Sequence, residues 1–216
     1  MDSTISRKID QFFSKYPKRS YPKDQIIIFA GENPDKVYYI VEGKVAQYDI
    51  SYRGDEVITN IFKPPAFFPM SNAINGTDNH LFFKTEIDTV VHLAPQADVV
   101  AFLKANPDVM LDLLGRVYRG IDGVLSRVLH LMSGTARSRL IYELIVECRR
   151  FGHTEPRGGF VLDTHEKDLA ARSGLSRETV SREMKRLKEQ SIIAITSDGI
   201  HVLDLARLES LLGSEV

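Results

Sequence analysis

The chain has 216 residues, of which 43% are hydrophobic and 26% are charged, and its net charge is -1 at pH 7. This composition is typical of a soluble globular protein and allows one large domain or two modest ones. The chain lacks an apolar run of about 18 residues and a signal-peptide core, and it has a single cysteine, Cys148, so we expect a cytoplasmic protein with no membrane span or intrachain disulfide.

The N-terminal part of the sequence changes from helical to β-type spacing near residue 20. Residues 3–15 have apolar side chains at helical spacing and predict a short amphipathic helix that packs on the rest of the chain. Between residues 21 and 95, runs rich in β-branched and aromatic side chains alternate with glycine: QIIIFA, VYYIVEG, KVAQYDI, EVITNIF and LFFKTEIDTVVHLA. Short strands at this spacing predict a small antiparallel barrel or roll.

A long apolar seam follows these strands. Its members lie three or four residues apart: Met110, Leu113, Val117, Ile121, Val124, Val128 and Leu131. This near-heptad spacing predicts one long helix, and a seam of this length favours a parallel partner helix from a second chain over the alternative of an intrachain core helix. Within the helix, Gly115, Gly120 and Gly123 would permit close approach of a neighbouring segment.

The C-terminal third begins after a candidate hinge at Ser133-Gly134-Thr135. A helix is predicted over residues 137–151, followed by a polar loop over residues 152–159 and a short strand at GGFVLD. The inner side of this helix is expected to carry Leu140, Leu144, Ile145 and Cys148. Near the C-terminus, SIIAIT and IHVLDL flank residues 197–199, whose Asp-Gly pair is typical of a hairpin turn. A small helix over residues 204–213 closes the chain.

The segment from Leu162 to Ile193 predicts two short helices joined by a tight turn. Gly174 suits a turn that needs a positive φ, and Ser176 is well placed to cap a second helix over residues 177–189. The buried face of that second helix is expected to carry Val180, Met184 and Leu187. This pattern is that of a helix-turn-helix whose second helix enters the major groove of DNA.

The opposite face of the second helix is polar and basic. The segment from Arg172 to Lys188 contains six basic residues and two acidic ones. A guanidinium can donate two hydrogen bonds to guanine, and a carboxylate can accept one from cytosine. The expected base contacts are Arg177, Glu178 and Arg182. The expected DNA-backbone contacts are Ser176, Thr179, Ser181 and Lys185, with Thr196 and Ser197 in the hairpin as weaker candidates. The alternative is a solvated helix with ion pairs such as Glu178 with Arg182.

Two segments resemble the CRP/FNR family of bacterial transcription regulators, named for the cyclic-AMP receptor protein. SRETVSREMKRLKEQSII resembles the family's recognition helix, and AGENPDKVYYIVEGKV resembles the opening of its cyclic-nucleotide-binding β-roll. The resemblance covers nearly the whole chain and implies an α+β fold. Residues 1–95 would form an antiparallel β-roll (a double-stranded β-helix) with a lead helix. Residues 96–134 would form a short helix and a long dimerisation helix with the hinge, and residues 135–216 a winged helix-turn-helix.

The resemblance also implies how such a protein acts. The expected partners are double-stranded DNA, a second copy of the chain and RNA polymerase. Because the Arg-Glu pair and the following Arg match the cyclic-AMP receptor type, the implied DNA site is a palindrome with half-sites like TGTGA. No cofactor is expected, and the resemblance alone does not decide between activation and repression.

The sensor domain departs from the family's cyclic-AMP-binding pattern. That pattern places a Gly-Glu pair at the ribose and an Arg followed by Ser or Thr at the cyclic phosphate, which a buried phosphate charge requires. Pro69-Met70 and His80-Leu81 stand there instead, no arginine occurs between residues 53 and 116, and Lys84 lies outside any such motif. We therefore predict that cyclic AMP is not bound in the usual way. Both an unidentified small-molecule effector and an effector-independent regulator remain open.

Two other functional classes fit the sequence less well. A metal-dependent, cupin-like enzyme would need clustered ligands, and the sequence has no HxH, HExxH, Walker or GxSxG pattern. We therefore expect no metal site at His80 or His92. Core positions are expected for Phe62, Phe67, Phe68, Phe82 and Phe83, with an apolar pocket lined by these rings as the alternative. The third class is a nucleotide-binding regulatory subunit without DNA binding. Two features disfavour it: the arginine that would hold the cyclic phosphate is missing, and the helix-turn-helix is intact.

Overall fold

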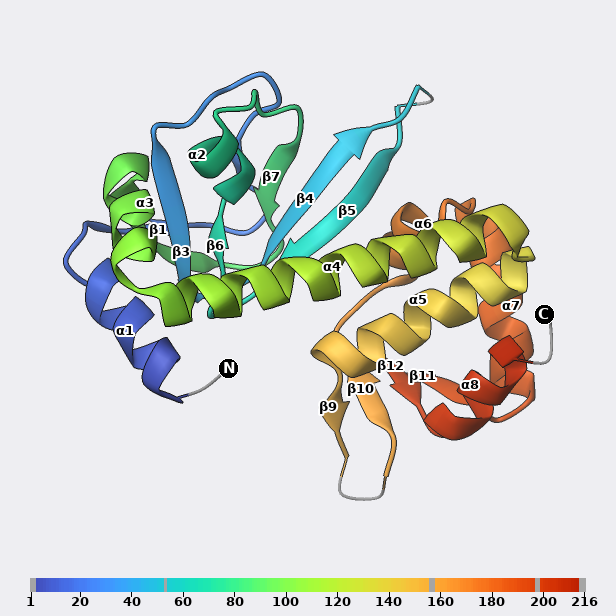
Figure 1. The fold of residues 1–216 in the computed structure, drawn as a ribbon. Coiled ribbons are helices and arrows are strands. Elements are labelled where there is room, and N and C mark those ends of the chain that lie inside the picture. Colours follow the sequence, from blue (N-terminus) through green and yellow to red (C-terminus); the bar gives the residue numbers. More distant parts are fainter. Residues whose placement is uncertain (1–2, 53, 156–157, 197–198, 214–216) are drawn as a thin grey trace. The chain divides into compact units, whose positions relative to one another are not determined.

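The computed structural model describes residues 3–52, 54–155, 158–196 and 199–213, and the chain divides into two compact units, residues 1–120 and 121–216 (Figure 1). Helix α4 (Pro107–Ser133) contributes its first half to one unit and its second half to the other. Within the described ranges, no helix combines the length and the hydrophobicity that a bilayer crossing requires.

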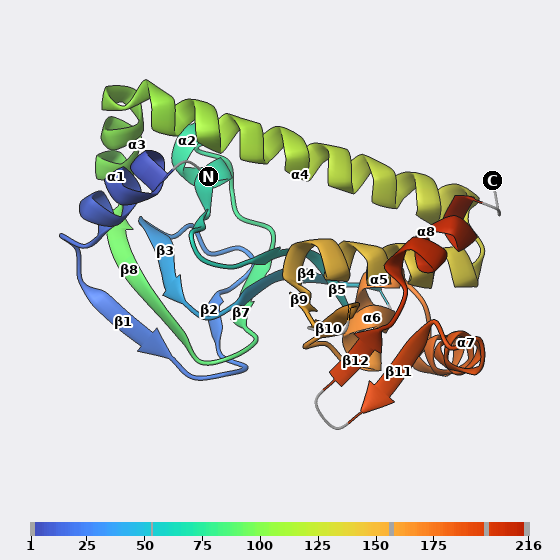
Figure 2. The same cartoon turned by 90° about the horizontal axis from the view of Figure 1, so that it is seen from below.

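The first unit is built on antiparallel sheets, as the sequence predicted for a roll (Figure 2). One sheet has the order β1-β8-β3-β6, and its strands are Lys18–Tyr21, Thr89–Pro95, Lys36–Glu42 and Phe67–Phe68. The other has the order β2-β7-β4-β5, and its strands are Ile26–Ile28, Phe82–Thr85, Val45–Ile50 and Glu56–Phe62. Strands far apart in the sequence are therefore neighbours in both sheets.

Aromatic side chains fill the interior between these strands. The ring of Phe68 is stacked on that of Phe83, with centroids 5.0 Å apart, and Phe62 and Tyr38 stack on Phe68 at 5.0 and 5.6 Å. Phe67, Phe68 and Phe83 are buried, and the half-buried ring of Phe82 stacks on Tyr48. Stacked rings in this arrangement stabilise a core beyond their buried area. The predicted core role is confirmed for Phe67, Phe68 and Phe83, and the partly buried Phe62 packs against that core, whereas Phe82 is only half-buried and lies outside it.

Helices cover one face of the first sheet (Figure 2). They are α1 (Ser3–Phe13), α3 (Gln96–Ala105) and the first turn of α4. The residues buried between helices and sheet include Ile9, Phe13, Val37, Ala94, Val99, Leu103 and Val109. The lead helix predicted over residues 3–15 is therefore real and has the predicted packing role.

The first unit differs from the sequence prediction in one merged pair of strands and in three short elements that were not predicted, β1, β6 and α2 (Met70–Asn75). The run LFFKTEIDTVVHLA is two strands, β7 and β8, separated at residues 86–88. Helix α2 lies between β6 and β7 and was not expected from the sequence. Strands β1 and β6 also escaped detection. Elements of two to six residues are too short for a periodic pattern, and α2 has no fully buried side chain to create one.

The apolar seam of α4 is largely exposed on the single chain. Val117 in the first unit and Val124 in the second are 48% and 52% exposed. Other seam positions and their neighbours are also exposed: Met110, Leu114, Ile121, Leu125, Val128 and Leu129. The stripe is therefore not covered as it would be in the alternative of an intrachain core helix. A Cβ at Gly120 or Gly123 would meet only open space.

The second unit contains a helix-turn-helix with a small antiparallel sheet. Its helices after α4 are α5 (Ala136–Phe151), α6 (Glu166–Ser173), α7 (Arg177–Glu189) and α8 (Leu205–Gly213). Its sheet has the order β11-β12-β10-β9, with strands Ile193–Thr196, Gly199–Val202, Phe160–Leu162 and His153–Thr154. The predicted hairpin is β11 and β12, although its turn residues Ser197 and Asp198 lie outside the described residues. Strand β9 occupies the start of the segment expected to be a loop.

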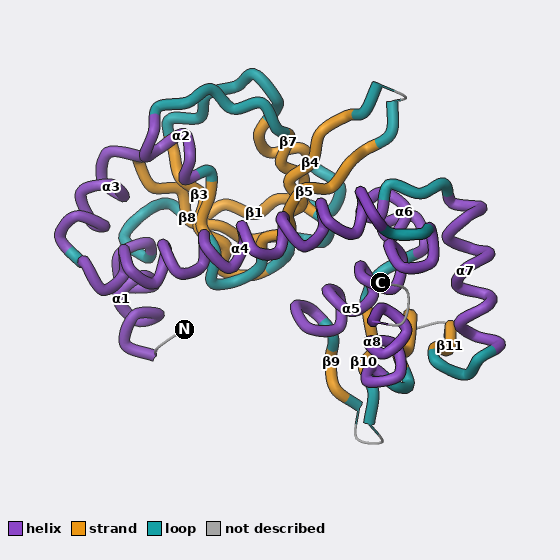
Figure 3. Tube along the Cα trace, turned by 45° about the vertical axis from the view of Figure 1, so that its right-hand side comes forward, coloured by secondary structure: helices purple, strands orange, loops and turns teal. Residues whose placement is uncertain are grey.

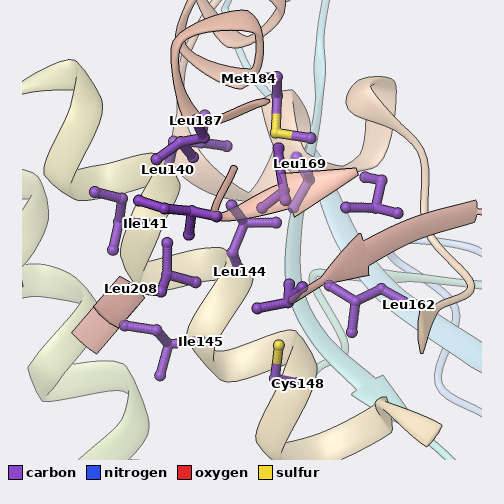
Figure 4. Packing of buried hydrophobic residues seen from close by; sticks show 14 of the residues in the cluster. Leu140, Ile141, Leu144, Ile145, Cys148, Leu162, Leu169, Met184, Leu187 and Leu208 are labelled. Atoms are coloured by element: carbon purple, nitrogen blue, oxygen red, sulfur yellow. The ribbon is translucent and has the colours of Figure 1, made fainter. Parts of the chain in front are cut away.

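One apolar core holds this unit together, and α5 lies at its centre (Figure 4). The inner side of α5 carries Leu140, Leu144, Ile145 and Cys148 as predicted, and all four are buried. Against them pack Leu169 from α6, Leu208 from α8 and the buried face of α7. Burial raises the pKa of the Cys148 thiol to about 12, so this cysteine is an inert core residue.

Helix α7 has the bounds and the cap that the sequence predicted. Figure 3 shows it as a helix separate from α6, joined to it by a short loop. Gly174 has a φ of 64°, and its N–H donates to Ala170 of α6, which closes the turn between the helices. Ser176 is the N-cap, and its Oγ accepts a hydrogen bond from the Thr179 N–H at 3.3 Å. Val180, Met184 and Leu187 are at most 1% exposed.

Buried ion pairs join α5 to its neighbours. Arg172 of α6 donates from Nη1 to Glu147 Oε2 at 2.7 Å and from Nη2 to Thr164 Oγ1 at 2.6 Å. Arg127 of α4 makes a two-point contact with Glu143, at 2.7 and 3.0 Å. Burial raises the pKa of Glu143, and the charge of Arg127 opposes that rise. Partnered charges of this kind fix the geometry of the elements that carry them, because separating them leaves a buried charge alone.

Replacing Arg172 tests this buried pair. Arg172→Met would leave the carboxylate of Glu147 buried without its partner, and we expect the free energy of unfolding to fall by about 3–5 kcal/mol. Urea unfolding of the full chain measures the change. The double variant Arg172→Met/Glu147→Met should be less destabilised than the single one, since no charge is stranded. A single variant as stable as the parent would contradict the assignment.

The N-cap of α7 gives a second prediction. Ser176→Ala removes the acceptor of the Thr179 N–H, and we expect a loss of about 1 kcal/mol in the free energy of unfolding. Ser181→Ala is the matched control, because Ser181 is exposed in the middle of the same helix. Its effect should stay within about 0.5 kcal/mol. Equal effects of the two substitutions in urea unfolding would show that Ser176 is not a stabilising cap.

Candidate nucleic-acid interface

The exposed face of α7 brings together most of the predicted DNA contacts. Arg177, Glu178, Ser181, Arg182 and Lys185 are exposed, and together with Glu166 of α6 they line an open depression on the surface. The buried side chains of α7 lie on the opposite side of the helix (Figure 4). Because one face of α7 is buried in the core, its other face, which carries the basic side chains, points outward.

Glu178 is an ionised acceptor at the N-terminal end of α7. Its pKa lies below its usual range because its own backbone N–H donates to the carboxylate, with smaller contributions from the Ser176 side chain and from the charge of Arg177. Negative charge is favoured at this end of a helix. At neutral pH the site therefore offers an acceptor beside the guanidinium donors.

The ion pair that would have supported a purely solvated helix does not form. Among the residues that the structure describes, no ion pair joins Glu178 to Arg182. Arg182 instead lies 3.8 Å from Glu183 Oε1, which is close to the limit of an ion pair. Glu183 is buried and makes its short contact, 2.7 Å, with Arg186. The guanidinium of Arg182 is thus only loosely held, and its side chain is 60% exposed.

The remaining predicted backbone contacts fall into different places. Ser176 and Thr179 lie at the capped end of α7, where the two hydroxyls are 3.1 Å apart. Thr196 ends strand β11, and its Oγ1 lies 2.9 Å from Nε2 of His201. Ser197 was also predicted, but it lies outside the described residues.

Sequence reasoning missed three residues of this region. Glu166 lines the depression beside α7. In the sequence it stands in the first turn of α6, where an acidic residue is explained by the helix dipole alone. His201 and Glu155 form a contact of 3.1 Å between β12 and the segment after β9. They are 46 positions apart, and no local pattern links them.

The sensor unit holds none of the polar groups that the cyclic-AMP pattern needs at the matching positions. Pro69 precedes α2 and Met70 begins it. The Lys84 ammonium is 2.6 Å from Glu56 and lies over the ring of Tyr48, so its charge is already balanced. His80 is exposed, and His92 Nδ1 lies 2.8 Å from the backbone oxygen of Tyr16. In the described part of the chain, no group of three or more His, Cys, Asp or Glu side chains is placed to hold a metal ion.

Comparison with known proteins agrees with this architecture. Residues 18–106 match the cyclic nucleotide-binding domain family, and residues 138–211 match the Crp-like helix-turn-helix domain family. The global nitrogen regulator of Synechocystis is 28% identical over 193 residues, covering 85% of this chain and 83% of that protein. The cAMP-activated global transcriptional regulator CRP of Haemophilus influenzae is 22% identical over 186 residues, covering 86% of this chain and 83% of that one.

A solved structure extends the likeness to three dimensions. FixK2 from Bradyrhizobium japonicum matches with a TM-score of 0.76 and 25% identity, covering 91% of this chain and 96% of that chain. The relatives are transcription regulators and not enzymes, which agrees with the absence of catalytic motifs in the sequence. This chain therefore belongs to the CRP/FNR family of transcription regulators, with a cyclic nucleotide-binding-like domain ahead of a Crp-like helix-turn-helix.

Proposed function

We propose that the protein is a homodimeric transcription regulator that binds a palindromic promoter site without cyclic AMP. In this proposal residues 1–95 form the sensor domain, residues 96–134 the dimerisation region and residues 135–216 the DNA-binding domain. It would act in the cytoplasm, where it meets the promoter and RNA polymerase. The observation that carries the proposal is the exposed row of Arg177, Glu178 and Arg182 on the first two turns of α7.

Each member of this row has a chemical role at a base edge. Arg177 and Arg182 are proposed to donate to O6 and N7 of guanines, and the ionised Glu178 to accept from N4 of a cytosine. This set is compatible with half-sites like TGTGA. The proposed phosphate contacts are Ser176, Thr179, Ser181, Lys185, Thr196 and Ser197. Such contacts set the position of the protein on the duplex and leave the sequence choice to the base contacts.

Dimerisation is supported by the exposed apolar seam of α4. A parallel partner helix from a second copy would cover this seam, because the seam residues recur at the spacing of a coiled coil. Two recognition helices related by a two-fold axis would then meet two inverted half-sites about one helical turn apart. The site's palindromic symmetry would follow directly from the symmetry of the dimer.

Binding without cyclic AMP is supported by what fills the sensor roll. A buried cyclic phosphate needs a guanidinium or a set of amide donors. The matching positions carry Pro69-Met70 and His80-Leu81, and the nearby cation, Lys84, is already paired. The stacked rings of Phe62, Phe68 and Phe83 pack the interior. The regulator is therefore either effector-independent or responsive to a different small molecule.

A binding assay on ligand-free protein tests the proposed function. The purified chain is used to select duplexes from a random library, and its affinity for the selected site is measured by fluorescence anisotropy. We expect an inverted repeat and tight binding without additive. Added cyclic AMP should leave the affinity unchanged. Selection of no common sequence would overturn the proposal, and binding only after addition of cyclic AMP would overturn its effector part.

The base-contact assignment predicts the behaviour of Arg182→Ala. Loss of a bidentate contact should weaken binding to the selected site by about 1–3 kcal/mol and relax the preference at one base pair of each half-site. Lys104→Ala removes the same charge from α3 and serves as the control, with binding expected to match the parent. An Arg182→Ala variant that keeps the parent's affinity and preference would remove Arg182 from the base contacts.

The phosphate-contact assignment predicts a different signature for Lys185→Ala. Binding should weaken by a similar factor on cognate and scrambled duplexes, because phosphates carry no sequence information. The slope of log affinity against log salt concentration should fall by about one per lost contact. A titration at several salt concentrations checks both expectations. A loss confined to the cognate duplex would instead make Lys185 a base contact.

The dimer proposal predicts the effect of Val124→Glu. A carboxylate in the seam would be buried without a partner in the dimer, so the chain should become monomeric and its affinity for the palindrome should drop. Light scattering on a sizing column reports the mass. Ile74→Glu is the control, since Ile74 is 58% exposed on α2 and is not a member of the seam. A dimeric Val124→Glu variant would contradict the assigned interface.

A further inference from the structure

A glutamate interrupts the apolar stripe that buries one face of α7. The buried side chains Val180, Met184 and Leu187 recur at i, i+4 and i+7, and Glu183 occupies position i+3 on the same side of the helix. Its side chain is only 5% exposed. An apolar side chain of similar size is often at least as stabilising at such a position as a buried carboxylate. Packing alone therefore does not explain the glutamate.

The two oxygens of the Glu183 carboxylate differ in their partners. Oε1 accepts a hydrogen bond from Nη1 of Arg186 at 2.7 Å. Oε2 is buried, and no donor in the described part of the chain bonds to it. The side chain of Arg186 is 55% exposed, so this one ion pair leaves the buried negative charge only partly compensated. The carboxylate can therefore hold a second cation.

Arg182 is a second cation close to this carboxylate. Its Nε lies 3.8 Å from Glu183 Oε1, and its side chain is 60% exposed. This separation is longer than a hydrogen bond, so the guanidinium is near the carboxylate without being bound to it. A shift of about 1 Å would bring Nε–H of Arg182 to the usual hydrogen-bond distance from Oε1. That oxygen has two lone pairs and can accept from both guanidinium groups.

The donors of Arg182 can be divided between this carboxylate and a base. A guanidinium has five N–H donors, and the O6 and N7 atoms of a guanine accept two of them. When Nε–H donates to Glu183, the two terminal NH2 groups remain for the guanine, and the plane of the guanidinium is fixed. Fixing this plane lowers the entropic cost of the base contact, because a flexible side chain has fewer orientations left to lose.

We propose that Glu183 is a positioning residue whose buried carboxylate holds Nε–H of Arg182, so that both terminal NH2 groups of this arginine face one guanine. The inference rests on the proposed function, since it needs Arg182 to contact a base. It goes further by naming the group that orients this arginine. It also explains why a carboxylate stands on the buried face of α7. In this arrangement Arg186 bonds to the same carboxylate and balances its charge.

The first test compares affinities for the selected duplex and for a scrambled one, measured by fluorescence anisotropy. Glu183→Leu should lower the ratio of these affinities about tenfold, because Arg182 loses a charged hydrogen-bond partner. Binding to the scrambled duplex should stay equal or become tighter, since a negative charge is removed from α7. Glu189→Leu removes the same charge from an exposed position of α7, and its ratio should match the parent's. Equal weakening of Glu183→Leu on both duplexes would indicate a merely structural role and overturn the proposal.

A double-mutant cycle shows whether the effect of Glu183 passes through Arg182. In the Arg182→Ala background, Glu183→Leu should cause no further fall in the affinity ratio, because the side chain that it positions is gone. Arg186→Met removes the other partner of the carboxylate and should leave the ratio at the parent's value. Additive effects of Glu183→Leu and Arg182→Ala would overturn the proposal, and so would an Arg186→Met variant with the full fall in the ratio.

Substitution of single bases locates the effect on the DNA. Guanines of the selected site are replaced one at a time by 7-deazaguanine, which lacks the N7 acceptor. At the guanine that Arg182→Ala no longer distinguishes, Glu183→Leu should lose less affinity than the parent. At the other guanines the losses of the two proteins should be equal. A Glu183→Leu variant with the parent's losses at every guanine would contradict the proposal.

Urea unfolding separates positioning from folding. Glu183→Leu should be at least as stable as the parent, because it replaces a buried charge by an apolar side chain. Glu183→Gln keeps the shape and loses the charge, so its ratio should fall less, and it decides the matter should Glu183→Leu fail to fold. A parent chain that selects no sequence would refute the proposed function. A parent that selects a site, while Glu183→Leu and Glu183→Gln keep its affinity ratio, would overturn this inference alone.

Discussion

The burial of one apolar face of α7 is the constraint on which the rest of the helix-turn-helix depends. Val180, Met184 and Leu187 are buried against the core built on α5, and each contributes about 1.5–3 kcal/mol by its removal from water. Since a helix cannot rotate without exposing these side chains, the opposite face is held outward. The positions of the guanidinium groups on that face therefore depend on the side chains that are buried on the opposite face of the same helix.

Helix α5 connects this seat to the rest of the second unit. Its carboxylates Glu143 and Glu147 are buried and face Arg127 of α4 and Arg172 of α6. Two elements are thus joined to α5 through charges that are costly to separate. The second half of α4 also receives hydrogen bonds from Arg139 and Tyr142 of α5, at 2.6 and 3.1 Å. Helix α5 therefore contacts both α4, which carries the proposed dimer seam, and α7, the proposed recognition helix.

The helix-turn-helix was predicted well from the sequence because the patterns that indicate it are local. The bounds of α7, its cap at Ser176 and the turn at Gly174 all depend on residues within a few positions of one another. Strand boundaries in the roll were less accessible, since β1, β6 and α2 are too short to show a period. The contact of His201 with Glu155 joins segments that only the folded sheet brings together. Long-range pairs of this kind leave no spacing rule in a single sequence.

Replacement of single guanines by 7-deazaguanine across the selected site tests the central claim that α7 reads base edges. This change removes the N7 acceptor and leaves base pairing and backbone charge intact. The account predicts that the parent loses affinity at symmetric guanines in the two half-sites, and that Arg182→Ala is insensitive at one of them. Uniform affinity for every substituted duplex would contradict it.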